Sequence, residues 1–148
     1  MKVALGSDHG GFALKEAIKK HLNRKGIEFV DYGTFNNESV DYPDYGRITA
    51  EAVMRGECDR GIAICGTGIG ISLAANKVKG IRCALVSEEY SARMAKAHNN
   101  ANMIAMGGRV VGEGIATGIV DVWLETEFEG GRHERRVEKI MEIEGSGK

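Results

Sequence analysis

The sequence of 148 residues predicts an α/β fold built on a doubly wound, mostly parallel sheet of five strands with helices on both faces. Short apolar segments of strand length alternate with segments in which apolar residues recur every three or four positions. The connections between them are short and rich in glycine, which suits parallel strands joined by crossover helices. No linker or repeat divides the chain, so we expect a single domain over residues 1–148, with a flexible tail from about residue 145.

The expected strands are short apolar segments bounded by glycine or polar residues. The first and the third end at residues that can carry chemistry, Asp8 and Cys65. The expected strands cover, in order, residues 2–8, 27–32, 61–64, 81–86 and 103–106.

The expected helices are recognised by their apolar spacing and by the residues at their ends. The second has Asp44 as a possible cap, and the fourth has Ser87 as its cap with two glutamates in the positive first turn. The expected helices follow residues 10–11 as far as Gly26, and then cover residues 45–55, 71–76, 88–98, 114–125 and roughly 132–144.

The composition narrows the possible partners. The formal net charge is −1 with scattered lysines and arginines, which argues against a nucleic-acid binder or a binder of anionic membranes. The longest apolar segments have only strand length, and the N-terminus runs directly into a strand pattern, so we expect a cytoplasmic protein with a small-molecule partner. Three cysteines without CxxC spacing or a nearby histidine pair give no support for disulfides or for a zinc site, and we expect no metal.

The segment of residues 65–70, Cys-Gly-Thr-Gly-Ile-Gly, stands at an expected strand-to-helix turn. Such a glycine-rich turn aims backbone N–H groups outward and binds anions. A thiol at the edge of this positive field loses its proton more readily than a free cysteine, so Cys65 is a candidate base or nucleophile. The alternative interpretation is an ordinary turn beside a buried cysteine.

Polar residues of several segments are expected to gather beyond the carboxyl ends of the strands, where open α/β sheets bind ligands. Asp8 and His9 follow the first strand, Cys65 follows the third, and His98 with Asn99 precedes the fifth. Each has a simpler alternative: Asp8 can cap the first helix, His9 can be an exposed loop residue, and His98 with Asn99 can serve a helix end and a turn.

Two arginines of the last helix, Arg132 and Arg136, are four residues apart and so share one face. Their guanidinium groups match the oxygens of a phosphate dianion, although a solvated basic face explains the spacing as well. Arg109 belongs either to the same basic cluster or to a subunit contact.

Two nucleotide-binding motifs also contain a glycine-rich turn. A Walker loop is excluded because Gly-Lys-Ser and Gly-Lys-Thr do not occur in the sequence. A dinucleotide-binding turn would follow the first strand and have a third glycine where Ile71 stands. Nucleotide chemistry is therefore poorly supported.

Five motifs in this order resemble the type B ribose-5-phosphate isomerases, within a larger group that includes galactose-6-phosphate isomerases. The resemblance covers nearly the whole chain. It implies a Rossmann-like fold, activity without metal or cofactor, and homodimers or homotetramers with the active site between subunits. The motifs are Gly-Ser-Asp-His-Gly-Gly at 6–11, Asp-Tyr-Pro at 41–43, residues 65–70, His-Asn at 98–99 and Gly-Gly-Arg at 107–109.

The resemblance also implies roles for individual residues. Cys65 matches the base that moves a proton between C1 and C2 of the open-chain sugar through a cis-enediolate, and His98 matches the acid that opens the ring. Some members have serine in place of this cysteine and use a glutamate in the loop, so Cys65 and Ile69 place the chain in the cysteine branch. The implied substrate-binding residues are Asp8, His9 and Tyr42 for sugar hydroxyls or ring opening, Gly66, Thr67, Gly68, Ile69 and Gly70 for the anion hole, Thr67 also for proton transfer between the sugar oxygens, Asn99 for a sugar oxygen, Arg132 and Arg136 for the phosphate, and Arg109 from across the dimer interface.

The implied activity is the interconversion of ribose 5-phosphate and ribulose 5-phosphate. Two alternatives stay open at this point: a hexose-6-phosphate isomerase acting on allose or galactose 6-phosphate, and a non-catalytic module that binds a sugar phosphate or nucleotide. One additional CHOH unit in the substrate need not alter any of the motifs.

Overall fold

The computed structural model describes residues 1–146, and its centre is a parallel sheet of five strands. The strands lie in the order β2-β1-β3-β5-β4, and every neighbouring pair is parallel. The predicted fold class is confirmed. The strands are β1 (Lys2–Ser7), β2 (Glu28–Asp31), β3 (Arg60–Cys65), β4 (Cys83–Leu85) and β5 (Met103–Gly107).

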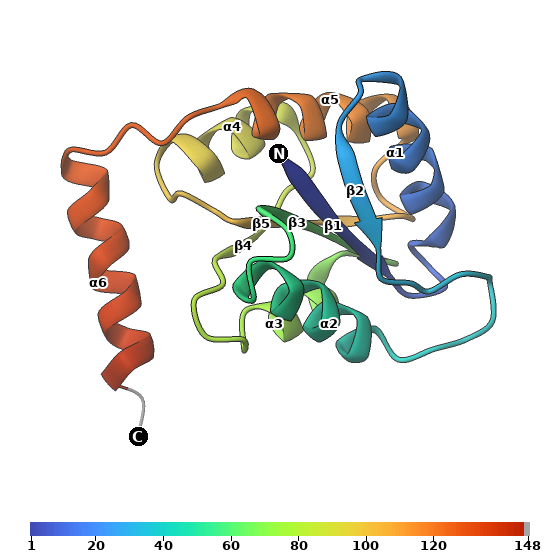
Figure 1. Cartoon of the computed structure of the whole chain (residues 1–148), viewed down its shortest axis with the longest axis horizontal. Coiled ribbons are helices and arrows are strands. Elements are labelled where there is room, and N and C mark those ends of the chain that lie inside the picture. The colour runs from blue at the N-terminus through green and yellow to red at the C-terminus, as the bar shows by residue number, and fades with distance from the viewer. Residues whose placement is uncertain (147–148) are drawn as a thin grey trace.

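Helices cover both faces of this sheet, as Figure 1 shows. On one face lie α1 (Phe12–Arg24), α4 (Glu89–Ala97) and α5 (Glu113–Glu125), and on the other lie α2 (Tyr42–Met54) and α3 (Ile69–Ala75). Successive strand residues face opposite layers, so Ile62 and Ile64 belong to the core under α1 and α5, whereas Ala63 and Cys65 belong to the core under α2 and α3. The thiol of Cys65 is therefore directed to the α2 and α3 side.

The sixth helix, α6 (Arg132–Ser146), stands apart from the two helical layers, beyond the edge strand β4 (Figure 1). Its distal end is tied to the body where both carboxylate oxygens of Glu144 accept the Gly80 N–H, at 3.0 and 3.1 Å. Residues 145 and 146 continue this helix, and the expected flexible tail from about residue 145 stays a prediction. Residues 147 and 148 lie outside the described residues. None of the helices in the described part of the chain is long and apolar enough to cross a bilayer.

Two helix starts differ from the prediction. α2 begins at Tyr42 instead of residue 45, because Pro43 fits the first helical turn, where its missing N–H has no partner to lose. α4 is capped by Glu88 instead of Ser87: the Glu88 carboxylate accepts the Ser91 N–H at 2.9 and 3.0 Å. A carboxylate also complements the positive end of the helix.

A buried ion pair supports the carboxyl end of β1. Lys15 of α1 is fully buried, donates to the Thr34 carbonyl at 2.6 Å and pairs with Asp31. The N–H of Thr34 in turn donates to the Ser7 carbonyl at 2.7 Å. Burial opposes the charge of Asp31, but hydrogen bonds from Lys15 and Lys19 hold the pKa of this carboxyl below its ordinary value. The pair thus fixes the backbone immediately before Asp8.

Candidate active site

The carboxyl ends of β1 and β3 lie side by side and carry Asp8 and Cys65. Ser7 is in register with Ile64, and the Asp8 N–H donates to the Ile64 carbonyl at 3.2 Å. The strand order reverses between these two strands, with β2 on one side and β5 and β4 on the other. Such a switch point is the usual ligand crevice of an open α/β sheet.

Cys65 opens a tight turn that leads into α3. Gly68 has a φ of +81°, and a Cβ atom there would lie 2.7 Å from the carbonyl carbon of Met106, so only glycine fits. This conformation directs the Gly68 N–H toward the Cys65 sulfur, 3.1 Å away. Cys65 is only 4% exposed. An N–H donor in this position stabilises negative charge on the sulfur.

The outer part of the turn faces solvent. Thr67 is exposed, and its hydroxyl oxygen accepts the Ile69 N–H at 3.2 Å, so the hydroxyl lies at the mouth of the site. Ile69 and Gly70, predicted as loop, form the first turn of α3. The N–H groups of Gly68 and Ile69 donate within the turn, to Cys65 Sγ and to Thr67 Oγ1, and the expected anion hole stays a prediction.

Arg109 belongs to the same chain as the Cys65 turn that it covers. Its N–H donates to the Gly66 carbonyl at 3.0 Å, and its Nη1 lies 3.2 Å from the position that a Gly66 Cβ would take. Arg109 reaches the turn because it follows β5, which is the direct neighbour of β3. The expected role of Arg109 across a dimer interface stays a prediction.

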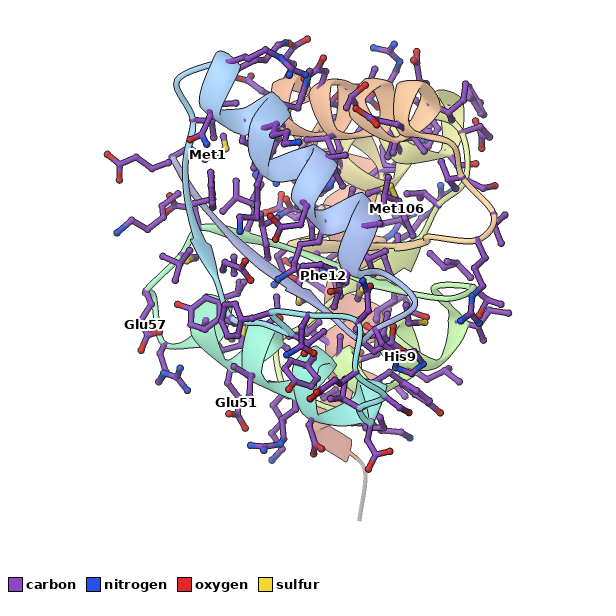
Figure 2. All side chains as sticks on the ribbon, turned by 90° about the vertical axis from the view of Figure 1, so that its right-hand side faces the viewer. Met1, His9, Phe12, Glu51, Glu57 and Met106 are labelled. Carbon is purple, nitrogen blue, oxygen red and sulfur yellow. The ribbon has the colours of Figure 1, made fainter. Side chains whose placement is uncertain are left out.

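Three further predicted residues, Asp8, His9 and Tyr42, also lie at the carboxyl ends of the strands. Asp8 is 6% exposed, and its Oδ1 accepts the Gly11 N–H at 3.1 Å. Gly11 is the N-cap of α1 and the start of this helix has no side-chain cap, so Asp8 does not cap the helix. His9, which lies at the opposite end of β1 from Met1 (Figure 2), accepts the Val40 N–H at its Nδ1, 3.2 Å away. The neutral ring therefore carries its hydrogen on Nε2. The ring of Tyr42 fills the space where a Gly70 side chain would be.

His98 and Asn99 lie at the amino ends of the strands, opposite to the end that carries Cys65; we call this end of the sheet the amino edge. The Asn99 carbonyl accepts from Arg82 Nε at 3.2 Å, and the carbonyl of nearby Asn102 accepts the N–H of Gly61, near the start of β3, at 3.0 Å. The prediction that all polar residues gather at one edge is wrong within a single chain, because α4 runs antiparallel to the strands and returns to their amino ends. The four residue steps from Gly61 to Cys65 alone span about 13 Å.

Arg132 and Arg136 lie near this amino edge as well. Both are exposed in the first turns of α6, and their predicted common face is preserved because the helix includes both. His133, between them, stacks on His98 with ring centroids 4.0 Å apart and an interplanar angle of 7°. Burial, and then the positive charges of His98 and Arg132, lower the pKa of His133.

Glu129 completes a cluster that the sequence analysis missed. Its Oε2 lies 3.5 Å from His98 Nε2 and 3.4 Å from His133 Nε2. Among the described residues, these three form the one group of histidine, cysteine or acidic side chains able to hold a metal ion, with donor atoms within 4.8 Å of one another. The available signal was the four-residue spacing of Glu129 and His133, but nothing in the sequence joins that pair to His98.

Comparisons with known proteins agree with this architecture. A family model described as Ribose/Galactose Isomerase matches residues 3–140. The chain belongs to this family. It is 53% identical to ribose-5-phosphate isomerase B of Escherichia coli over 143 residues, which covers 97% of this chain and 96% of that protein.

Solved structures of the family are also similar over nearly their whole length. Ribose-5-phosphate isomerase B of Clostridium thermocellum superposes with a TM-score of 0.97 at 60% identity, covering 98% of both chains. The Mycoplasma genitalium enzyme, solved with bound ribulose-5-phosphate, has a TM-score of 0.93 at 42% identity and covers 99% of this chain and 97% of its own.

The predicted site residues of this family member thus form two groups in one chain. The carboxyl-edge group comprises Asp8, His9, Tyr42, residues 65–70 and Arg109. The amino-edge group comprises His98, Asn99, Arg132 and Arg136, to which the structure adds Glu129 and His133. The sheet separates the two groups.

Proposed function

We propose that the protein is an aldose–ketose isomerase that interconverts D-ribose 5-phosphate and D-ribulose 5-phosphate. The observation that carries the proposal is the Cys65 turn, where a buried thiol at the end of β3 has a backbone N–H 3.1 Å from its sulfur. Isomerisation moves one proton between adjacent carbons, and it needs a base beside donors that stabilise oxygen charge. The 53% identity to the Escherichia coli enzyme supports the assignment of the pentose phosphate.

In the proposed mechanism the furanose opens first. His98 donates a proton to the ring oxygen as the bond from C1 to that oxygen breaks. Asp8 or His9 accepts the proton of the C1 hydroxyl, which leaves the open-chain aldehyde. An imidazole such as that of His98 can donate this proton at neutral pH because the ordinary pKa of histidine lies near neutrality. Tyr42 and Asn99 bind the sugar oxygens during this step.

The Cys65 thiolate then removes the C2 proton, and the electron pair moves through C1 to the carbonyl oxygen to give a cis-enediolate. N–H groups of residues 66–70 hold the new negative charge, a contribution whose loss typically costs about a hundred- to a thousandfold in rate. The Thr67 hydroxyl passes a proton from O2 to O1. Cys65 returns its proton to C1, which yields the ketose and restores the thiolate.

A complete site requires a second copy of the chain, and we propose a homodimer in which His98, Asn99, Arg132 and Arg136 of one subunit complete the Cys65 site of the other. The acid and the base act on the same sugar, so both must contact it. The positions of these groups at opposite edges of one sheet support the exchange. A homotetramer would consist of two such dimers.

The surface around α6 supports the same arrangement. Ile140 and Ile143 are 45% and 72% exposed, and an apolar groove lined by Ile81, Cys83 and Ile140 lies between α6 and the β4 edge. Apolar surface of this kind is stabilised when a partner covers it. A two-fold dimer covers it twice and places both α6 helices at the partner's carboxyl edge.

We also propose that the protein works in the cytoplasm without a cofactor. Cys58, Cys65 and Cys83 are all free thiols, and a thiolate base must stay reduced to act. The substrate is a small sugar phosphate, and neither nucleic acid nor membrane is a partner in this proposal.

The direct test is the turnover of ribose 5-phosphate, allose 6-phosphate and galactose 6-phosphate by the purified protein with EDTA present. We expect the highest kcat/KM with the pentose phosphate. The family description includes galactose, and a preference for a hexose phosphate would keep the mechanism but replace the substrate. Binding of all three without turnover would replace the enzyme by a sugar-phosphate-binding module.

A further inference from the structure

We propose that His98, Glu129 and His133 form a binding site for Zn²⁺, and that the bound ion inhibits the isomerase because it occupies His98. The three side chains come from the end of α4, the segment that follows α5, and the first turn of α6. Binding by itself is independent of the proposed function, whereas inhibition rests on it.

The donor separations match a single ion. The carboxylate Oε2 lies 3.5 and 3.4 Å from the two Nε2 atoms, and all three donors lie within 4.8 Å of one another. Two ligands of a tetrahedral Zn²⁺ with bonds of about 2.0–2.1 Å are about 3.3–3.4 Å apart. For these separations, the point equidistant from the three donors is at most about 2.4 Å from each, so the donors reach bonding distance of one ion once the histidine rings turn toward it.

The cluster is held from several sides and still has room to adjust. The Glu129 N–H donates to the Ala97 carbonyl at 3.0 Å, which fixes the segment against the end of α4. The His133 side chain is only 10% exposed and has the least room to move, whereas those of His98 and Glu129 are 36% and 56% exposed. The stacked rings must turn to direct their Nε2 lone pairs at one ion, and the more exposed His98 ring has the space to do so.

The donor set selects the kind of cation. Two imidazoles and one carboxylate suit Zn²⁺, whereas Mg²⁺ and Ca²⁺ prefer sites made of oxygen ligands. Arg132 and Arg136 act electrostatically on His133 and oppose a cation. They therefore favour an anion, such as inorganic phosphate or chloride, as the fourth ligand, because it offsets the added charge.

Coordination changes what His98 can do. An imidazole whose Nε2 binds a metal cannot donate a proton from that atom, so ring opening stops while the ion is bound. Zn²⁺ removal by a chelator restores the free imidazole. The same residues thus serve the substrate in one state and the metal in the other.

Zinc binding is tested on the full-length protein without substrate, by titration against a chromophoric chelator. We expect one Zn²⁺ per chain, no competition from Mg²⁺, and at least about tenfold weaker binding in Glu129→Gln and in His133→Asn. The matched control is Glu127→Gln, an exposed carboxylate on the same segment, which should bind as tightly as the unmodified chain. Thermal melting shows whether each variant is folded.

A thiol site is the competing explanation, because Cys65 is also a zinc ligand by type. Zinc binding that persists in Glu129→Gln and His133→Asn but disappears in Cys65→Ala would overturn the proposed site. A four-coordinate Co²⁺ absorption spectrum without a thiolate charge-transfer band would support it.

Inhibition is measured as the zinc concentration that halves ribose 5-phosphate turnover, with each variant normalised to its own zinc-free rate. We expect this concentration to rise by the same factor as the dissociation constant and EDTA to restore activity. Equal inhibition of all variants would overturn the blocking role. An inactive protein that still binds zinc through these residues would refute the proposed isomerase function and leave the metal site standing.

Discussion

The two edges of the sheet are built by different means. At the carboxyl edge, Cys65 and Asp8 are buried at the ends of adjacent strands, and backbone N–H groups fix the sulfur and the carboxylate. At the amino edge, Arg132 and Arg136 are exposed on a helix that stands outside the two helical layers (Figure 1). The rigid edge suits the proton transfer between carbons, which needs exact geometry, and the projecting helix suits a substrate clamp completed by a partner.

The largest expected effect is at the carboxyl edge. Replacing Cys65 by alanine removes the proposed base, so kcat for ribose 5-phosphate should fall about a thousandfold while KM changes little. Steady-state kinetics measures kcat and KM, and a titration of the variant with ribulose 5-phosphate measures whether binding is kept. The control is Cys58→Ala, a buried cysteine away from the turn and the α6 groove, because burial raises the pKa of its thiol and makes it a poor base. Turnover retained in Cys65→Ala would contradict the assignment of the base.

The next effect distinguishes a site within one chain from a site between two. Cys65→Ala and His98→Asn should each be nearly inactive alone. In a random equimolar mixture half of the dimers contain one of each chain, and one of their two sites has both native residues. We therefore expect about one quarter of the activity of the unmodified protein after co-refolding, a recovery of several hundredfold. Activity that stays at the level of the separate variants would contradict a shared site.

How much the sequence predicts differs between the edges. Periodicity and turn residues locate all the helices and strands of the described chain. The Cys65 turn can be predicted because the cysteine and the glycines that follow it are adjacent in the sequence. From the sequence we expect His98 at the carboxyl edge, and this is wrong within one chain because the distance of His98 from β5 along the sequence does not show the direction of α4. The antiparallel course of a crossover helix supplies that direction.

Other details depend on contacts that no local pattern encodes. The cap of α4 is Glu88 because its carboxylate reaches the Ser91 N–H. Backbone geometry, which the sequence pattern does not show, determines that Glu88 and not the adjacent Ser87 is the cap. The metal-ligand cluster joins His98 to Glu129 and His133, which lie more than thirty positions later in the sequence, and only tertiary structure brings them together. The position of Arg109 follows from the pairing of β5 with β3, which the order of the elements does not determine.

A third prediction concerns what holds the carboxyl edge rigid. Lys15→Met leaves the Asp31 carboxylate half-compensated in a buried position, and we expect the free energy of unfolding to fall by about 3 kcal/mol. Urea denaturation measures the change. Lys20→Met, on the exposed face of the same helix, should lie within about 0.5 kcal/mol of the unmodified chain. Equal stability of the two variants would show that the buried pair contributes nothing net.

The same pair should make stability depend on acid. Because the fold holds the pKa of Asp31 below its ordinary value of 3.8, the contribution of the pair is fully present above that value. It is lost as the pH falls through the lowered pKa of the folded state. The difference in unfolding free energy between the unmodified chain and Lys15→Met should therefore shrink below about pH 4. A difference that stays constant to lower pH would assign it to packing of the lysine stem instead of charge.

The smallest effect is expected at the amino edge, where Arg136→Ala removes one guanidinium group of the proposed phosphate clamp. A hydrogen bond to a charged group is worth about 1.5–3 kcal/mol, so KM for ribose 5-phosphate should rise about ten- to a hundredfold while kcat changes less. Arg135→Ala is the matched control, since this adjacent arginine is also exposed but lies on another side of the helix. Equal increases in the two variants would indicate a general electrostatic effect of the basic helix. A large increase in Arg136→Ala, with partial recovery in Arg136→Lys, would distinguish a clamp that needs the planar guanidinium from one that needs only positive charge.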